Sequence, residues 1–259
     1  MSQQLSGLNL DIVAATRKPA VSTINPDFFS GAGIIEGDTK LVSQPASARN
    51  FSRMEFEKNI VVVGEGNRII FSETMLDKTP EQLGIPVIAG KYIQTLPNLE
   101  YEAIGINIRG FLSFPEGKDT ASKYITSNFL ADASWQGIGK SAVRASVNLV
   151  FDMERSPLYL SITEATMRKE EDETTIPIVM FSGSFSYAIN GKNPAEDIAY
   201  MQGIINNWQT DFATFNEIIN HHFLAKNILE NYQPNSQNQA YEEMPYGESE
   251  ANLFAMNGV

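Results

Sequence analysis

The residues that most resemble a chemical motif are Gly-Ile-Gly-Lys-Ser at positions 137–141, within the segment SWQGIGKSAVRASVNLVF (134–151). A phosphate-binding P-loop needs a glycine, four further residues and then Gly-Lys-Ser or Gly-Lys-Thr, between a strand and a helix whose N-terminus faces the phosphate. Here Ser134 occupies the position of the leading glycine, and residues 143–151 alternate between apolar and polar types, apart from Val150. This period of two is typical of a strand. We therefore predict a glycine-rich loop that enters a strand, and neither a nucleotide nor another cofactor.

Metal-binding and acid–base residues form no recognisable group in the sequence. The only histidines, His221 and His222, are adjacent, so on a helix they point about 100° apart and cannot share a metal as residues four apart can. The absence of cysteine excludes disulfides, thiolate nucleophiles and cysteine metal sites. Carboxylates that could do acid–base work are Asp132, Asp152, Glu154 and Glu164, but such residues are common on solvated sheet faces. We predict no catalytic and no metal-binding residues.

The charge balance restricts the partners of the chain. With 19 basic and 31 acidic residues, the 259-residue protein has a net charge of −12, whereas proteins that bind nucleic-acid backbones cluster Lys and Arg. The N-terminal segment lacks the charged start and apolar run of a secretion signal, and no apolar run approaches the ~18 residues that a membrane helix needs. We expect a cytoplasmic protein without a nucleic-acid or membrane partner.

Period-two patterns and turn residues predict an antiparallel sheet. The segment Gly64-Glu-Gly-Asn67 joins two apolar runs and is typical of a β-hairpin turn. Strands are expected over residues 51–57, 59–63, 68–71, 103–114, 142–152, 157–167 and 176–189. The last two flank the sequence RKEEDETT, so they should form a hairpin whose charged tip favours solubility and protects the edge.

Two helices have clear start signals, in each of which a capping residue precedes a proline. Thr79-Pro80 begins the first, and Pro86 favours a kink or a new start there. Asn193-Pro194 begins the second, whose apolar residues recur every three or four positions, as in a helix that packs on one face. This helix could continue to Tyr232. It could also break near residues 209–211, because Thr and Asp are favoured at the start of a helix.

The two helix starts suggest an internal repeat. The pattern F-S-x5-K-[TN]-P occurs at Phe71 and again at Phe185. A duplicated β-x-βββ-α unit would divide the chain into residues 1–97 and 98–232, with a short helix over about 117–130 in the second half. The alternative is a coincidence within one α+β domain. In both cases we predict an α+β fold in which helices, including a long C-terminal one, cover one face of an antiparallel sheet.

The favoured function is a non-enzymatic binding or assembly protein that associates with itself. The candidate interface is the apolar stripe of the last helix with the histidine beside it, although such a stripe more often covers the sheet of its own subunit. Its residues are Trp208, Phe212, Phe215, Ile219 and His222. The acidic tail, residues 233–259, has four Glu and no Lys or Arg, and we expect it to be flexible or to dock on a partner.

Two alternative functions stay open. The first is a binder of a small hydrophobic ligand, in which a curved sheet grips the long C-terminal helix around an apolar cavity, by analogy at the level of the fold. The expected lining comprises Val147, Leu149, Phe151, Leu160, Ile162, Phe181 and Ile205. The second is an enzyme of unknown class, for which the sequence offers no signature.

Overall fold

The computed structural model describes residues 4–36, 39–114, 119–168, 175–191 and 193–225. Its strands are β1 (Ser6–Thr16), β2 (Ala46–Ala48), β3 (Phe51–Phe56), β4 (Ile60–Glu65), β5 (Arg68–Thr74), β6 (Tyr101–Ser113), β7 (Val147–Phe151), β8 (Leu158–Arg168) and β9 (Thr175–Ala188). Its helices are α1 (Pro26–Gly31), α2 (Ile85–Thr95), α3 (Thr120–Phe129), α4 (Pro194–Asn206) and α5 (Trp208–Ile218), and a π-helical turn, Ile219–Phe223, follows α5. The predicted α+β class is confirmed.

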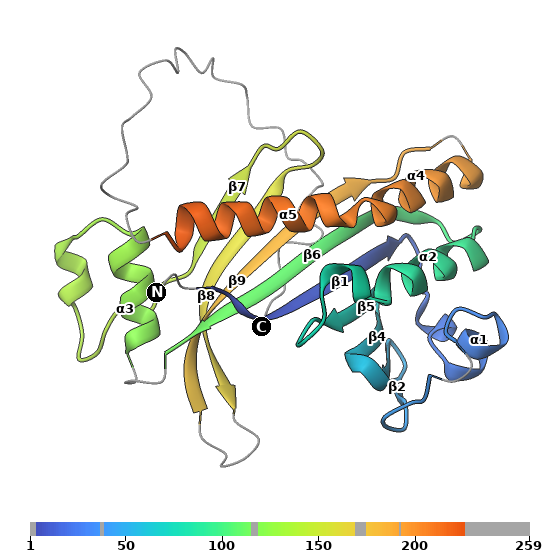
Figure 1. Cartoon of the computed structure of the whole chain (residues 1–259), viewed down its shortest axis with the longest axis horizontal. Helices are drawn as coiled ribbons and strands as arrows, with labels where there is room; N and C mark the ends of the chain where they lie inside the picture. Colours follow the sequence, from blue (N-terminus) through green and yellow to red (C-terminus); the bar gives the residue numbers. More distant parts are fainter. Residues whose placement is uncertain (1–3, 37–38, 115–118, 169–174, 192, 226–259) are drawn as a thin grey trace.

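All nine strands belong to one antiparallel sheet with the order β2-β3-β4-β5-β1-β6-β9-β8-β7 (Figure 1). The strands β1 and β6 form the central pair. A three-strand meander lies on each side of this pair, with its last strand innermost: β5, β4 and β3 on one side, and β9, β8 and β7 on the other. This is the order that a duplicated unit would require, while the duplication itself stays a hypothesis. Ile12 pairs with Ile106, so the two predicted halves share one sheet across the connection at Pro97.

The core lies between the sheet and its helices. Alternate side chains of the two central strands are fully or almost fully buried: Leu10, Ile12 and Ala14 of β1, and Ile104, Ile106 and Ile108 of β6. Helix α2 contacts β1 and β5, whereas α4 and α5 contact β6. Figure 1 shows α2, α4 and α5 crossing the sheet on the same side. None of the described helices is long and apolar enough to cross a membrane.

The predicted helix starts are confirmed, with one correction to each helix. Thr79 begins only a short 3-10 turn, and α2 begins anew at Ile85 with Pro86 in its first turn. The Asn193 side chain accepts a hydrogen bond from the Glu196 N–H at 3.0 Å, which caps α4. The long helix is interrupted at Asn207, whose φ of −108° and ψ of 18° are not helical, close to the predicted break. Residues beyond Ala225, including the predicted end at Tyr232 and the acidic tail, lie outside the described residues.

The predicted strands are present, and the largest error concerns the one that follows the P-loop-like segment. Strand β7 begins at Val147, whereas the alternation predicted a start at Ala142. Residues 142–146 have no ladder partner, and Arg144 instead bonds through its side chain to Glu164 of β8. Strands β8 and β9 form the predicted hairpin, in which Arg168 pairs with Thr175, and its charged tip lies outside the described residues.

Candidate functional site

The P-loop-like segment forms a loop rather than the start of a helix. A short 3-10 turn covers Ser134–Gly137, and Gly139 has a φ of +113°, which favours glycine. Lys140 is exposed, and the next regular element after it is strand β7. The prediction that this segment leads into a strand is therefore confirmed. The helix N-terminus that would face a bound phosphate does not follow Lys140.

The apolar stripe of the last helix lies mostly inside the subunit. Trp208 and Phe212 are at least nine-tenths buried, and Phe215 and Ile219 are completely buried. A Cβ atom on Gly183 of β9 would lie only 2.5 Å from the Phe215 ring, so this glycine allows the close approach of helix and sheet. His222, the fifth residue of the predicted interface, is exposed, and so is its neighbour His221. The four apolar side chains belong to the core, and an assembly surface has to be sought among other residues.

The residues expected to line an apolar cavity fall into two groups. Leu160, Ile162, Phe181 and Ile205 are almost completely buried. The Phe181 ring lies 6.5 Å from the ring of Phe129 and 6.3 Å from that of Phe223, so protein side chains pack on it. Val147, Leu149 and Phe151 are instead half-buried on strand β7, at the edge of the sheet.

A surface groove of about 360 Å³ lies between α2 and the junction of α4 with α5. At this contact, the Gln202 side chain donates a hydrogen bond to the carbonyl oxygen of Gly90 at 2.7 Å. The lining combines the exposed Val87 with several amide side chains, among them Gln94 and Gln209. Of the residues expected to line the predicted cavity, the groove shares Ile205 alone, and its lining is more polar than that of the predicted cavity.

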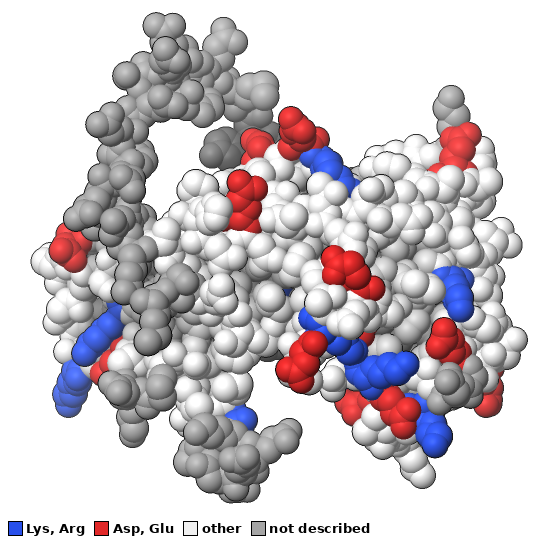
Figure 2. All heavy atoms as spheres, in the orientation of Figure 1, with Lys and Arg blue, Asp and Glu red and all other residues white. Residues whose placement is uncertain are grey.

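The carboxylates considered for acid–base work do not form a group. Asp132, Asp152 and Glu154 are exposed, and Glu164 accepts hydrogen bonds from Ser122 at 2.6 Å and from Arg144 at 3.2 Å. Among the described residues, no three acidic or histidine side chains are placed to hold a metal ion. Figure 2 shows that charges of both signs are interspersed on the visible face, without a broad basic patch.

Two buried carboxylates, Glu73 and Asp11, are held by hydrogen bonds and ion pairs that give them a structural role. Glu73 binds the Lys78 ammonium and accepts a hydrogen bond from the Ile85 N–H at 2.8 Å, so it caps α2. Asp11, which alternates with core residues of β1, binds Arg109 at 2.7 Å on the opposite face of the sheet. Ser72 also donates to Asp11, at 2.6 Å. Both carboxylates therefore hold neighbouring elements together.

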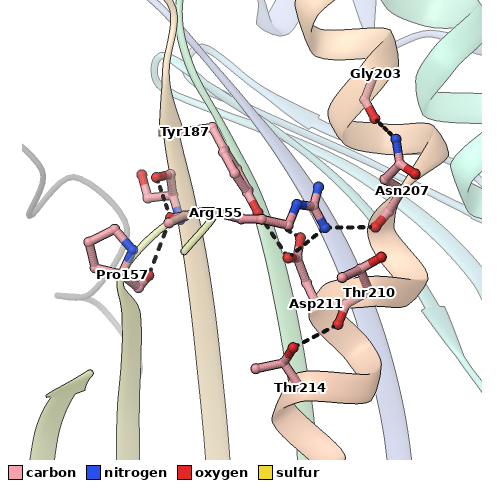
Figure 3. Close-up of polar contacts among 10 residues, drawn as sticks. Arg155, Pro157, Tyr187, Gly203, Asn207, Thr210, Asp211 and Thr214 are labelled. Carbon is pink, nitrogen blue, oxygen red and sulfur yellow. Dashed lines mark hydrogen bonds and ion pairs between the residues drawn. The ribbon is translucent and has the colours of Figure 1, made fainter. Parts of the chain in front are cut away.

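A third buried carboxylate, Asp211, fastens α5 to the sheet (Figure 3). The Tyr187 hydroxyl of β9 lies 2.9 Å from each Asp211 carboxylate oxygen, to which it donates. Arg155, in the turn between β7 and β8, donates at 3.0 Å both to Asp211 and to the carbonyl of Asn207 at the helix break. Burial raises the pKa of Asp211, against the lowering effect of these two donors. Burial, followed by the charge of Asp211, also raises the pKa of Tyr187.

Tyr187→Phe is expected to lower the free energy of unfolding by about 1–2 kcal/mol, because one buried hydrogen-bond donor to Asp211 is lost while Arg155 keeps its position. Urea denaturation followed by circular dichroism measures this effect. Tyr159→Phe on the neighbouring strand β8, where the side chain is half-buried, is the matched control. A cost as small as that of the control would show that the Tyr187–Asp211 contact contributes nothing.

The remaining candidate is the free edge of the sheet at β7. In the described part of the chain, β7 pairs with β8 alone. Its side chains Val147, Leu149 and Phe151 are half-buried and pack against the core, while Val150 is 60 % exposed on the other face. The strand has no charged residue and no proline, which are the usual means of protecting an edge. The opposite edge, β2, has only three residues, and all three are exposed.

No protein-family model and no curated protein matches this chain. Its function must therefore be inferred from geometry. Sequence patterns predicted the strand at β7, but they could not show that it would be the last strand of the sheet. The strand order depends on pairings between distant residues, and only that order exposes this edge.

Proposed function

We propose that the protein is a non-enzymatic binding and assembly protein that associates with itself through the free edge of β7. The observation that carries this proposal is an open strand edge with apolar side chains and without a charged residue or proline. Such an edge offers unpaired backbone N–H and C=O groups to another chain. A strand added by a partner satisfies these groups and extends the sheet.

An exposed apolar side chain of β7 itself supports the same location. Val150, one of the seven large hydrophobic side chains that are exposed in the described residues, belongs to β7. Covering apolar surface contributes about 25 cal/mol per Å². An association at β7 therefore gains from side chains as well as from backbone hydrogen bonds.

The expected result is a dimer in size-exclusion chromatography with light scattering, with a mass of twice the 28.7 kDa of the chain. The measurement extends to about 100 µM, where an association worth about 5.5 kcal/mol is half complete. Leu149→Lys should give a monomer, because it places an ammonium group at the centre of the edge. Leu149 is only half-buried, so the lysine can reach solvent without unfolding the strand.

The matched control is Val87→Lys, which introduces the same charge at an apolar residue that is 59 % exposed on α2. This variant should stay dimeric, and circular dichroism should show that both variants keep the fold. A wild-type protein that is monomeric at every concentration would contradict the proposal. So would a Leu149→Lys variant that is folded and dimerises as tightly as the wild type.

A further inference from the structure

We infer that the partner at β7 is a second copy of the same chain, paired antiparallel about a two-fold axis at Leu149. This inference rests on the proposed function and deepens it by naming the partner and the register. The segment around the edge strand is RASVNLVFDME, residues 144–154, with Leu149 at its centre. Antiparallel pairing of this segment with itself places the apolar residues of the core-facing side opposite one another.

The five residues of β7 are complementary to themselves in this register. Leu149 faces Leu149 of the second copy, and Val147 faces Phe151 of the second copy. These side chains are the half-buried ones that already pack against the core, so the partner covers their remaining exposed surface. On the other face, Asn148 lies opposite Val150. Direct cross-strand neighbours of this kind stabilise a sheet by about 0.2–1 kcal/mol per pair.

The residues flanking the strand continue the match. Ala145 lies opposite Met153 of the second copy, and both side chains are partly buried against the core of their own subunit. Arg144 and Glu154 lie outside the ladder, three residues beyond either end of β7. The two-fold axis brings each of them toward the oppositely charged residue of the second copy, once on each side of the axis. Arg144 is available for this pair, because its side chain is 75 % exposed although it also contacts Glu164. No two like charges are opposed anywhere between residues 144 and 154.

Other registers use the edge less well. The smallest shift that keeps the apolar faces on the same side is two residues, because successive side chains of a strand alternate between faces. After such a shift, only residues 147–149 or 149–151 of β7 still pair with β7 of the second copy. The register centred on Leu149 is the one that pairs the whole strand.

This arrangement closes on itself. A two-fold interface uses the same surface of both copies, so the pairing consumes both β7 edges and joins the two sheets into one. Each end of the joined sheet is then formed by β2, which is short, exposed and composed of Ala46, Ser47 and Ala48. Short edge strands are poor templates for further pairing. The inference is therefore a dimer and not a filament.

Charge exchange at the two flanking positions tests the register. Arg144→Glu opposes two pairs of carboxylates, and Glu154→Arg opposes two pairs of guanidinium groups. We expect each variant alone to dimerise about 10-fold more weakly than the wild type. The double variant R144E/E154R restores opposite charges and should recover wild-type affinity to within about 3-fold. An equimolar mixture of the two single variants should form mainly the heterodimer, in which both pairs are opposite in charge.

Sedimentation velocity gives the dissociation constants, and native mass spectrometry distinguishes the heterodimer from the two homodimers. Glu164→Gln is the control, because it removes the charge that pairs with Arg144 within the subunit and leaves the cross-subunit pair intact. This variant should dimerise like the wild type. A wild-type monomer would overturn the proposed function and this inference together. A wild-type dimer whose single variants dimerise normally, or whose mixture shows no preference for the heterodimer, would overturn the register while self-association stands.

Discussion

Replacement of Phe215 by alanine is expected to lower the free energy of unfolding by about 3–5 kcal/mol. Phe215 is completely buried, and its ring lies against Gly183 in the middle of β9. The glycine allows helix and sheet to approach closely, and the side chain of Leu158 lies beside the ring. Removal of the ring therefore leaves a cavity in the contact between α5 and the sheet, and the lost packing adds to the lost apolar burial.

Urea denaturation at several protein concentrations measures this cost and separates it from any effect of dimerisation. Tyr200→Ala on α4 is the matched control, because it removes an aromatic ring that is 50 % exposed, and its cost should stay within about 0.5 kcal/mol. If Phe215→Ala lowered the free energy of unfolding no more than this control does, the result would contradict the tight packing of Phe215 between α5 and the sheet.

The second large effect is expected for Asp211→Ala, at about 3 kcal/mol. The alanine leaves the buried Tyr187 hydroxyl without its acceptor and releases Arg155 from the helix break. The Arg155 side chain is 32 % exposed and can turn to water, which keeps the cost below that of stranding a fully buried charge. Double-mutant analysis with Tyr187→Phe should show an interaction energy, because both changes remove the same hydrogen bond.

Asp211 also predicts the sign of a pH effect. Because burial raises its pKa in the folded state, folded protein binds this proton more tightly than unfolded protein does. The resulting stability is fully present below the unfolded pKa of about 3.9 and is lost as the pH rises through the folded pKa. Compared with Asp211→Asn, which cannot titrate, the wild type should gain relative stability as the pH falls from neutral. A gain toward neutral pH instead would mean that Arg155 dominates over burial.

Local rules predicted much of the fold because they act over a few residues. The cap at Asn193 was predictable because its side-chain bond reaches only to Glu196. The alternation of apolar and polar residues over 143–151 correctly predicted that the P-loop-like segment leads into a strand and not into a helix. The hydrogen-bonded ladder itself begins later, at Val147. Sequence patterns predicted neither the short helix α1 nor strand β2, because neither has a sustained period.

The properties of the candidate site depend on contacts between distant residues. No local pattern shows that Ile12 pairs with Ile106, yet this pairing determines which strands lie at the edges. The sequence does carry a signal for Asp211, namely a carboxylate within the apolar stripe between Trp208 and Phe215. Its partner Arg155 is 56 residues away, so the Asp211–Arg155 pair could not be predicted from spacing.

The central β1–β6 pairing has a consequence for biosynthesis. When the first half of the nascent chain emerges from the ribosome, β1 can pair with β5, but its other side must wait for β6. Translation proceeds at about 5–20 residues per second, so the stretch from Thr74 to Ser113 takes on the order of a few seconds. During this interval an eleven-residue strand is unprotected on one side. Slow codons before Ser113 would lengthen the interval, and a chaperone that binds nascent chains would have most to shield at this stage.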